Sequence, residues 1–461
     1  MDVTTVYNVM EGPGTEQQVA ETMLTVAITE PEEITPADVS RILHLFESHD
    51  KTVRLSASWA LGLVVSENPT AVAGSVDTLV SLLASEPESV HEEIYRALGY
   101  IASEYPTLVR DALEALDIDH DTHDKRFIAA VRDRELSDSV TTLAGPASEY
   151  EGLGAVAPDR ESTDTSPEPR PTRGRPPASP PPTPPRIDAR RGAFERVKSR
   201  GAGSHVDLWL VRYSTREGQQ SALLKRIRHR APAVFDAEFT ETLDEWQSID
   251  DHDAIVPVVS HGTIPKPWFV VEYQEGRRLS ERLGSLSDRE AHWIIDRIVD
   301  AVCHAHGSGV LHGGLSPRHI IFSRTYADHL WDYPKLSNWG IPRLLCQFTA
   351  LPMGVPPSYA APEQVAPDQF GGVDASTDIY HLGLMSYEIL TGRLPFADHP
   401  GAVLRKIVTE QPPVASQFAD GLPEAVDTVL AKALQKSKVH RYNTVRDFQT
   451  ELGGALRGAS L

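Results

Sequence analysis

The stretch HGGLSPRHIIF, residues 312–322, decides the fold of this chain together with PKLSNWGIPR, residues 334–343, which follows it closely. Three more stretches come after them in order: GVPPSYAAPEQ, TDIYHLGLMSYEILTGRLPF and KVHRY. Before them, the short apolar runs DLWLVRY, SALLKRI and WFVVEY predict strands, and long helical patterns follow from about Asp288. The order and spacing of the series are more informative than any one of its members.

From Phe194 to about Leu456 these stretches occur in the order and approximate spacing of protein kinase motifs. HGGLSPRHIIF is similar to the catalytic loop H-R-D-L-K-P-E-N-I-L, and PKLSNWGIPR to the metal motif V-K-L-T-D-F-G-I-A-R. The chain therefore resembles a degenerate, pseudokinase-like member of the bacterial and archaeal Ser/Thr kinases. The resemblance implies an α+β bilobal fold over residues 193–461, with a small lobe at about 193–273 and a large lobe at about 274–461.

The resemblance also implies a nucleotide site. Lys225 matches the strand lysine that grips the phosphates, and it would pair with a Glu of the following helix, for which we expect Glu241 rather than Glu238 or Glu245. Val206 replaces the third glycine of the phosphate loop, and Leu223 replaces the small residue above adenine. The full set of expected nucleotide-binding residues is Gly201, Gly203, Leu223, Lys225, Glu241, the gatekeeper Val271, the hinge residues Glu272 and Tyr273, and Ile321.

The catalytic residues depart from the family. Gly314 stands where the catalytic Asp should be, Ser316 where the Lys should be, and His319 where the metal-binding Asn should be. Asn338 replaces the Asp of the metal motif, and Trp339 replaces its Phe. Glycine cannot orient or deprotonate a hydroxyl, and an amide is a weaker ligand than a carboxylate for a hard dication. ATP binding is therefore possible, with Mg²⁺ binding weak or absent at the degenerate positions Asn338 and His319.

The residues that organise the large lobe are retained. His312 begins the catalytic loop, and Asp378 matches the Asp that anchors the next core helix. Glu363 and Arg441 match a buried ion pair of the family. Retained scaffold residues beside a stripped catalytic loop are typical of a domain that is kept folded for binding.

Residues 1–136 contain a repeat. VRLSASWALGLVVSENP, from Val53, aligns with VHEEIYRALGYIASEYP, from Val90, and a fainter copy ends at Pro31. The period of 37 to 38 residues resembles that of HEAT repeats and predicts an all-α helical solenoid, with a plain helical bundle as the alternative. Residues 137–192 are rich in Pro and Arg and predict a disordered linker, or less commonly a docking segment.

Composition bounds the partners and the location. The net charge of −21 disfavours duplex nucleic acid and resembles the acidity of proteins from salt-loving microbes, with an acidic mesophilic regulator as the alternative. The N-terminus does not resemble a secretory signal, and no run is apolar enough for a membrane span. Cys303 and Cys346 lack metal-site spacing and predict reduced thiols. We therefore expect a cytoplasmic protein whose protein partners bind the repeat and the kinase-like domain.

Three functions remain open. The leading hypothesis is a pseudokinase that acts as a nucleotide-binding or allosteric signalling module. The second is a divergent active kinase that transfers the ATP γ-phosphate to protein Ser or Thr, with Asp328 or Asp332 as a relocated carboxylate. The third is a scaffold that binds no nucleotide, because Leu223 and Val206 fill the pocket. The sequence does not decide whether Thr349, in the activation segment, is phosphorylated.

Overall fold

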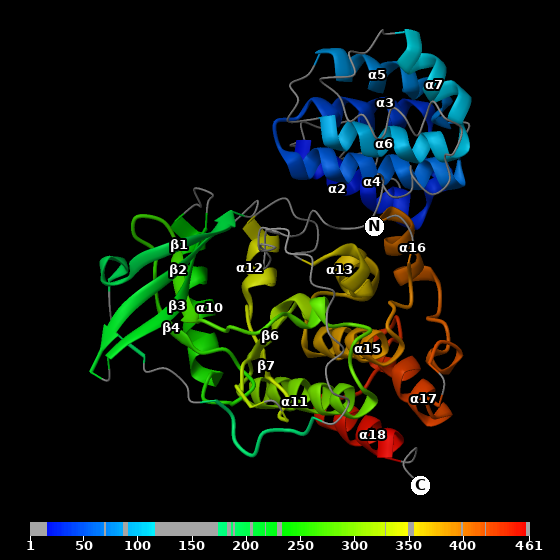
Figure 1. Ribbon diagram of the computed structural model, residues 1–461. Helices are drawn as coiled ribbons and strands as arrows, with labels where there is room; N and C mark the ends of the chain where they lie inside the picture. The colour runs from blue at the N-terminus through cyan, green and yellow to red at the C-terminus, as the bar shows by residue number, and fades with distance from the viewer. Residues whose placement is uncertain are drawn as a thin grey trace.

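The structure is a computed structural model, and it describes residues 16–68, 71–85, 91–115, 174–181, 186–187, 190–202, 206–216, 218–227, 233–327, 329–348, 355–397, 400–419 and 421–457. Two bodies follow one another along the chain: a helical unit and a larger bilobal part (Figure 1). Every helix in these ranges is too short or too polar to span a bilayer.

The small lobe is a five-stranded antiparallel sheet with one long helix against it. The strand order is β1-β2-β3-β5-β4, and the helix, α10 (Ala233–Ile249), packs against β4. The strands are β1 (Glu195–Ala202), β2 (Val206–Thr215), β3 (Gly218–Ile227), β4 (Val258–Gly262) and β5 (Trp268–Glu272).

Successive side chains of β3 point to opposite faces of the sheet. Ala222 and Leu224 are buried in a cluster on the outer face, whereas Leu223 packs against the main core and Lys225 is buried beside the catalytic loop. Because Leu223 and Lys225 share the inner face, the strand aims both side chains toward the large lobe.

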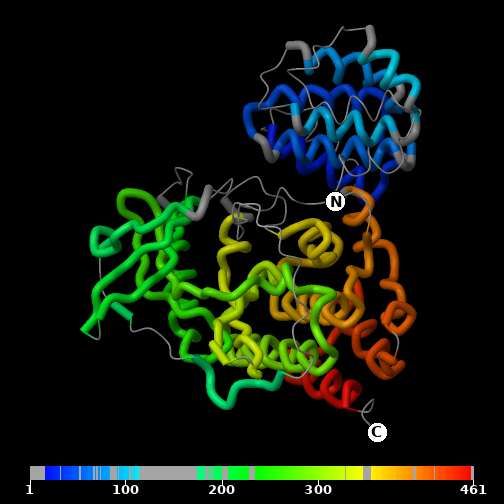
Figure 2. Tube along the Cα trace, in the orientation of Figure 1, coloured from blue at the N-terminus to red at the C-terminus, as the bar shows by residue number. Residues whose placement is uncertain are grey.

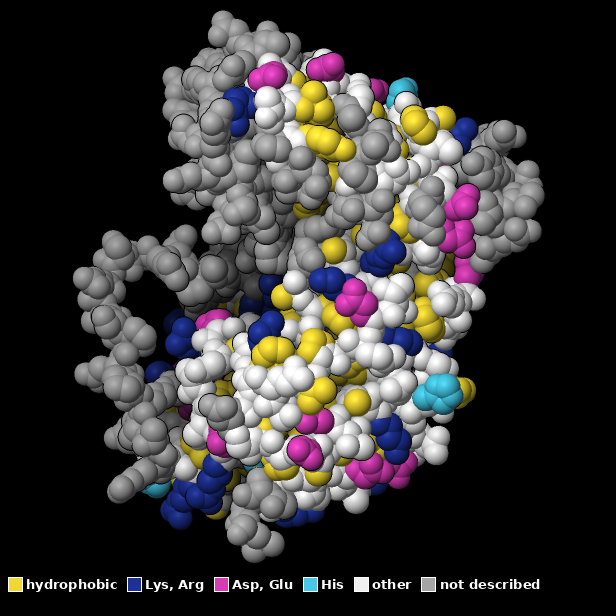
Figure 3. Space-filling view, turned by 90° about the vertical axis from the view of Figure 1, so that its right-hand side faces the viewer, with side chains coloured by type: hydrophobic (Ala, Val, Ile, Leu, Met, Phe, Trp, Pro, Cys, Tyr) yellow, Lys and Arg dark blue, Asp and Glu magenta, His cyan; other side chains and the backbone are white. Residues whose placement is uncertain are grey.

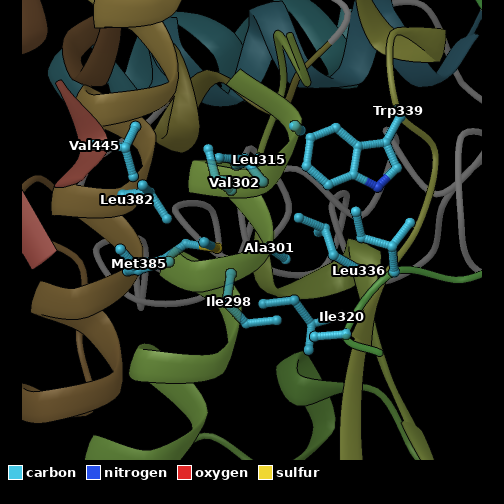
Figure 4. Packing of buried hydrophobic residues seen from close by; sticks show 14 of the residues in the cluster. Ile298, Ala301, Val302, Leu315, Ile320, Leu336, Trp339, Leu382, Met385 and Val445 are labelled. Atoms are coloured by element: carbon cyan, nitrogen blue, oxygen red, sulfur yellow. The ribbon is translucent and has the colours of Figure 1, made fainter. Parts of the chain in front are cut away.

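The large lobe is built on α11 (Asp288–Gly307), α15 (Ala375–Thr391), α17 (Glu424–Ala433) and α18 (Val445–Arg457). The β6–β7 hairpin (Ile320–Ser323 and Tyr333–Leu336) lies beside α11. Figure 4 shows side chains from α11, α15 and this hairpin meeting in one buried cluster, with Trp339 at its edge. The remaining helices are α12 (Ile341–Phe348), α13 (Pro362–Val365), α14 (Pro367–Phe370) and α16 (Pro400–Thr409).

The helical unit is all-α, as the repeat pattern predicted. Its helices are α2 (Glu16–Thr29), α3 (Pro36–His44), α4 (Lys51–Glu67), α5 (Val76–Ser85), α6 (His91–Glu104) and α7 (Pro106–Ala115). The two clear sequence copies form α4 and α6, which pack together. A Cβ on Gly62 would lie 2.6 Å from the Tyr100 ring, so the glycine lets the two helices approach.

Part of the segment expected to be a disordered linker lies against the bilobal part. Arg175 forms backbone hydrogen bonds with His329 and Trp331, at 3.1 and 3.0 Å. Farther along, Arg186 forms an ion pair with Asp250. Residues 174–181 and 186–187 therefore lie against the bilobal part, where paired backbone and a buried carboxylate hold them (Figure 2). We call residues 174–181 together with residues 186–187 the strap.

Candidate functional site

Gly314 occupies a space that has no room for a side chain. A Cβ there would lie 2.6 Å from Pro342 Cβ and 2.8 Å from Val355 Cγ1. Both neighbours belong to the activation segment, which we define as residues 341–361, and Val355 is fully buried. The place where the family has its catalytic carboxylate is therefore filled by two apolar side chains.

His319 points into the same loop. Its Nδ1 donates a hydrogen bond to Gly314 O at 2.9 Å, and its ring packs on His312 with 5.3 Å between centroids. His312 in turn packs on Trp339, at 5.1 Å, and donates from Nε2 to Ser337 O. Three rings from the catalytic loop and the metal motif thus form one buried group.

Burial sets the charge state of both histidines. It lowers the pKa of His312 to about 4, and burial together with the neighbouring His312 and Lys225 charges holds the pKa of His319 well below its usual range. Both rings are therefore neutral at pH 7. Ser316, which stands where the family has a Lys, is 1% exposed, and its hydroxyl has no hydrogen-bond partner within the described ranges.

Lys225 binds the altered metal motif directly. Its Nζ donates to Asn338 Oδ1 at 2.6 Å and lies 5.4 Å from the centre of the Phe269 ring. Burial, with a smaller effect from the Arg278 charge, lowers the pKa of Lys225 to about 7. Asn338 adopts a left-handed backbone conformation, with φ of 68°. The strand lysine and the metal motif are thus joined by one charge-assisted hydrogen bond.

The expected pairing of Lys225 with Glu241 does not occur. Glu241 is exposed on α10, and the next residue, Thr242, is the one that faces the site. A Cβ on Gly340 would lie 2.7 Å from Thr242 Cγ2, which places α10 directly against the metal motif. The choice of Glu241 failed because it belongs to a stripe of three acidic residues on α10. Such a stripe is typical of the face of a helix that is exposed to solvent.

The activation segment contributes to this arrangement. Directly after Gly340 it forms α12, which packs against α10. Leu344 and Leu345 of α12 are buried in the same core cluster as Phe235 and Phe239 of α10. A buried apolar face of α12 therefore lies beside the helix from which the family supplies its glutamate.

The residues that the resemblance assigns to the hinge, Glu272 and Tyr273, lie at the end of β5 and directly after it. Val271 is buried opposite Leu223, and the Glu272 N–H donates to Pro257 O at 3.1 Å. The Glu272 carboxylate accepts a hydrogen bond from Lys335, while Tyr273 is half-buried. Ile321 is half-buried in β6 and forms a bridge with Arg278.

The glycine-rich stretch is described only in part. Gly201 pairs with Leu208 in the sheet, and Gly203 lies outside the described residues. Val206 is 4% exposed and belongs to the core cluster between the lobes. Its side chain is therefore packed inward, as is that of Leu223, which is half-buried against the same cluster.

Asp378 anchors the catalytic loop. Its carboxylate accepts hydrogen bonds from the backbone N–H groups of His312 and Gly313, both at 2.9 Å, and from His306. Burial alone would raise the pKa of Asp378, but the hydrogen bonds with His306 and His381 lower it far below its usual range. The loop backbone is thus fixed although its catalytic side chains are gone.

Glu363 and Arg441 form a bidentate ion pair with no exposed side-chain surface. The two hydrogen bonds measure 2.8 and 2.7 Å. Burial alone would raise the pKa of Glu363, and the Arg441 guanidinium lowers it. The pair ties α13, which directly follows the activation segment, to the turn before α18.

Of the two residues suggested as a relocated carboxylate, the structure describes Asp332, which lies away from the catalytic loop. Asp332 sits at the turn end of the β6–β7 hairpin, where it accepts a hydrogen bond from Thr325 N. The catalytic loop joins the opposite end of that hairpin, at Ile320. Asp328 and Thr349 lie outside the described residues.

Sequence reasoning missed Pro342, Val355 and Thr242 as parts of the site. The signal for Pro342 was present, because it lies within the stretch PKLSNWGIPR and stands where the family pattern has Ala. Val355 and Thr242 are ordinary residues whose importance arises only when distant segments are brought together.

The protein kinase domain model matches residues 194–451. The kinase PrkC of Bacillus subtilis is 26% identical over 269 residues, which are 57% of this chain and 40% of that protein. The kinase PknB of Mycobacterium leprae is 32% identical over 215 residues, or 44% of this chain and 33% of that protein. The chain thus matches two fifths or less of the length of these relatives.

Among solved structures, the kinase domain of Mycobacterium tuberculosis PknI is 22% identical, with a TM-score of 0.44. The match covers 57% of this chain and 96% of that domain. The family model spans both lobes, the catalytic loop and the Glu363–Arg441 pair, and it accounts for more than half of the chain. This chain therefore belongs to the protein kinase domain family.

Proposed function

We propose that this kinase domain is a pseudokinase, which binds a nucleotide or acts as an allosteric signalling module and does not transfer phosphate. The observation that carries the proposal is the packing at Gly314, where Pro342 and Val355 occupy the space of a catalytic carboxylate. Without that group nothing in the loop orients the attacking hydroxyl or accepts its proton.

The residues at the metal positions do not fit Mg²⁺ in this arrangement. The Asn338 oxygen that would serve as a ligand accepts a hydrogen bond from the Lys225 ammonium group, and His319 Nδ1 donates to Gly314 O. Mg²⁺ prefers carboxylate and water oxygens in a strict octahedron. Weak or absent Mg²⁺ binding is therefore part of the proposal.

The proposal keeps nucleotide binding because Lys225, Val271 and the hinge are present. Burial lowers the pKa of Lys225 to about 7, and a polyphosphate beside its amino group would favour the charged form, so the site suits an anionic ligand. Val206 and Leu223, on β2 and β3, pack into the space where the resemblance places the nucleotide. This supports the scaffold alternative, in which no nucleotide binds.

The helical unit supports an interaction role in the cytoplasm. Its paired helices, with the close Gly62–Tyr100 approach, favour a HEAT-like repeat that presents a surface to protein partners. The net charge of −21 is suited to concentrated salt, so assays should include high potassium chloride.

The first test measures transfer of labelled γ-phosphate from ATP to the protein itself and to a generic substrate, with Mg²⁺ or Mn²⁺ and with Lys225→Ala as the control. We expect no transfer above the control. In parallel, the melting temperature is followed as ATP is added, with and without EDTA. A saturating rise that survives EDTA and disappears in Lys225→Ala supports the proposal, whereas no rise at all favours the scaffold.

The alternative is a divergent active Ser/Thr kinase, and the relatives named as such kinases favour it. Transfer that is abolished in Lys225→Ala would establish this alternative and refute the pseudokinase. The double variant Asp328→Asn with Asp332→Asn would then show whether a relocated carboxylate is responsible. Undiminished transfer in that variant would exclude both residues.

A further inference from the structure

Val355 belongs to two parts of the molecule at once. It lies over Gly314, as described above, and it is also fully buried in the hydrophobic cluster of the helical unit. That cluster contains the buried residues of α2 to α7 and continues without interruption into the large lobe. A change in the helical unit can therefore reach the degenerate catalytic loop through one side chain.

The shared cluster covers a defined face of the large lobe. This face consists of the end of the activation segment, α13 and α16, and we call it the α16 face. Helices α2 and α4 of the helical unit contact α16, while α16 contacts the turn Pro357–Tyr359. The large-lobe members of the cluster are Val355, Ala360, Val365, Ala366, Phe396, Val403, Leu404, Ile407 and Val408, all buried.

The contact is close enough to require a glycine. A Cβ on Gly401 would lie 2.7 Å from Leu63 Cγ and 2.9 Å from the backbone oxygen of Trp59. Gly401 is in the first turn of α16, where a larger residue would suit the helix better. Gly401 therefore allows α4 to pack closely against α16, and it does not stabilise α16.

The surface of the molecule is consistent with a buried contact between the helical unit and the α16 face, which we call the joint. Figure 3 shows the side on which α16 and the helical unit adjoin, and hydrophobic side chains there are interspersed with charged and polar ones. The apolar residues of the α16 face lie beneath this surface, each no more than 9% exposed. These residues share one hydrophobic cluster with the helical unit.

We propose that the helical unit is a built-in ligand of the large lobe, which occupies the α16 face and thereby holds residues 355–360 closed over Gly314. A protein partner that uses the α16 face has to displace the helical unit first. The proposal does not depend on whether the domain transfers phosphate, because it concerns what covers the loop and not the chemistry within it.

The test introduces a bulky side chain between the helical unit and the α16 face, in the protein that contains both units. Gly401→Glu introduces a side chain against Leu63 and the Trp59 backbone, and Gly454→Glu is the matched control, because Gly454 is an exposed helical glycine with no atom within 4 Å of its Cβ position. Tyr359 and Ala360 donate backbone hydrogen bonds to Pro356 and Pro357, so their exchange with solvent reports on the segment.

For Gly401→Glu we expect a larger radius of gyration in solution scattering and roughly tenfold faster exchange at Tyr359 and Ala360. Protection of α11 should be unchanged, and Gly454→Glu should match the wild type. Separation of the units without faster exchange at these two amides would overturn the proposal. An unchanged radius together with unchanged exchange would overturn it equally.

If Gly401→Glu does not fold, a pair of cysteines tests the same contact by crosslinking it. Leu63→Cys with Gly401→Cys, in a Cys303→Ser and Cys346→Ser background, places two thiols at the closest point of the joint. We expect a disulfide on mild oxidation and slower exchange at Tyr359 and Ala360 in the oxidised form than in the reduced form. Failure to crosslink, or equal exchange in both forms, would contradict the proposal.

Discussion

Gly314 has no side chain, and its neighbours use the room that this leaves. Pro342 and Val355 pack against its Cα, and His319 uses its carbonyl oxygen as an acceptor. Asn338 Oδ1 likewise accepts a hydrogen bond from Lys225. At the residue scale, the substitutions that distinguish this loop from the family pattern fit one another, so restoring one of them alone does not restore the family arrangement.

Gly314→Asp should therefore gain no phosphate transfer and should lower the stability of the domain. The new side chain meets two apolar groups at 2.6 and 2.8 Å, and overpacking of this kind costs about 1–3 kcal/mol. Urea unfolding together with the γ-phosphate assay measures both effects. Gly372→Asp, at a glycine with nothing within 4 Å, is the control and should behave as wild type. Gain of transfer in Gly314→Asp would refute the claim that Pro342 and Val355 exclude a working carboxylate from this place.

The contribution of the buried histidine His312 to the stability of the domain should rise with pH between about 4 and 6.5. The pKa of His312 is about 4 in the folded protein and that of an unfolded histidine is about 6.5, so the unfolded chain binds more protons in this window. His312 alone contributes up to about 3 kcal/mol that is present above pH 6.5 and lost as the pH falls.

Urea unfolding at pH 5 and pH 7 measures this dependence. Because the pKa of His319 is also depressed, His319→Asn should make the difference between the two pH values smaller. The exposed His440 provides the control variant His440→Asn, which should leave the difference unchanged. Equal pH dependence in all three proteins would show that the ring group is not buried in neutral form.

At the scale of elements, the strap joins parts of both lobes. It binds the turn before β7 through Arg175 and the end of α10 through Arg186, whose side chain also donates to Gln247 O. Ile187 N donates to Val259 O in β4. A Pro-rich segment has few states to lose on binding, so a small number of hydrogen bonds suffices to hold it.

Gly174→Val should release the large-lobe end of the strap. A Cβ on Gly174 would lie 2.3 Å from Trp331 Nε1 and 2.5 Å from its Cδ1, so a branched side chain cannot fit beside the indole. We expect roughly tenfold faster exchange of the Arg175 and Trp331 amides. Gly192→Val, at a position with open space, is the matched control. Unchanged exchange in Gly174→Val would mean that the strap is not held at this end.

At the scale of the whole molecule, three hydrophobic clusters account for the architecture. One fills the large lobe and reaches α10 and Val206 of the small lobe, one lies on the outer face of the sheet, and one joins the helical unit to the α16 face. The activation segment touches two of them, since Leu344 and Leu345 belong to the first and Val355 to the third.

Arg441→Leu should cost about 3–5 kcal/mol, because it leaves the fully buried Glu363 carboxylate without its cation. Lys438→Leu is the matched control three residues earlier, since its pair with Asp374 is more exposed and worth about 0–1 kcal/mol. The double variant Glu363→Leu with Arg441→Leu should recover much of the loss. Equal melting temperatures for Arg441→Leu and Lys438→Leu would show that the ion pair does not hold the large lobe together.

The kinase fold and the altered loop were predictable because motif order is a property of the chain itself. Each of Lys225, Val271, Asp378, Glu363 and Arg441 is positioned by a short strand, helix or turn around it, which is why a local motif could single it out. Glu241 failed as a prediction because a helix has several faces, and only packing against Gly340 selects the one bearing Thr242.

The sequence by itself determined the helical and kinase parts of the chain, the order of the kinase motifs and the presence of a glycine at position 314 in the stretch that resembles the catalytic loop. Only the tertiary structure decided what fills that place, which residue of α10 faces the site, where the strap lies and what covers the α16 face. The reason is physical. Local patterns record which residues are apolar and where turns occur, whereas Val355, Pro342 and Gly401 gain their roles from contacts between segments far apart in the chain.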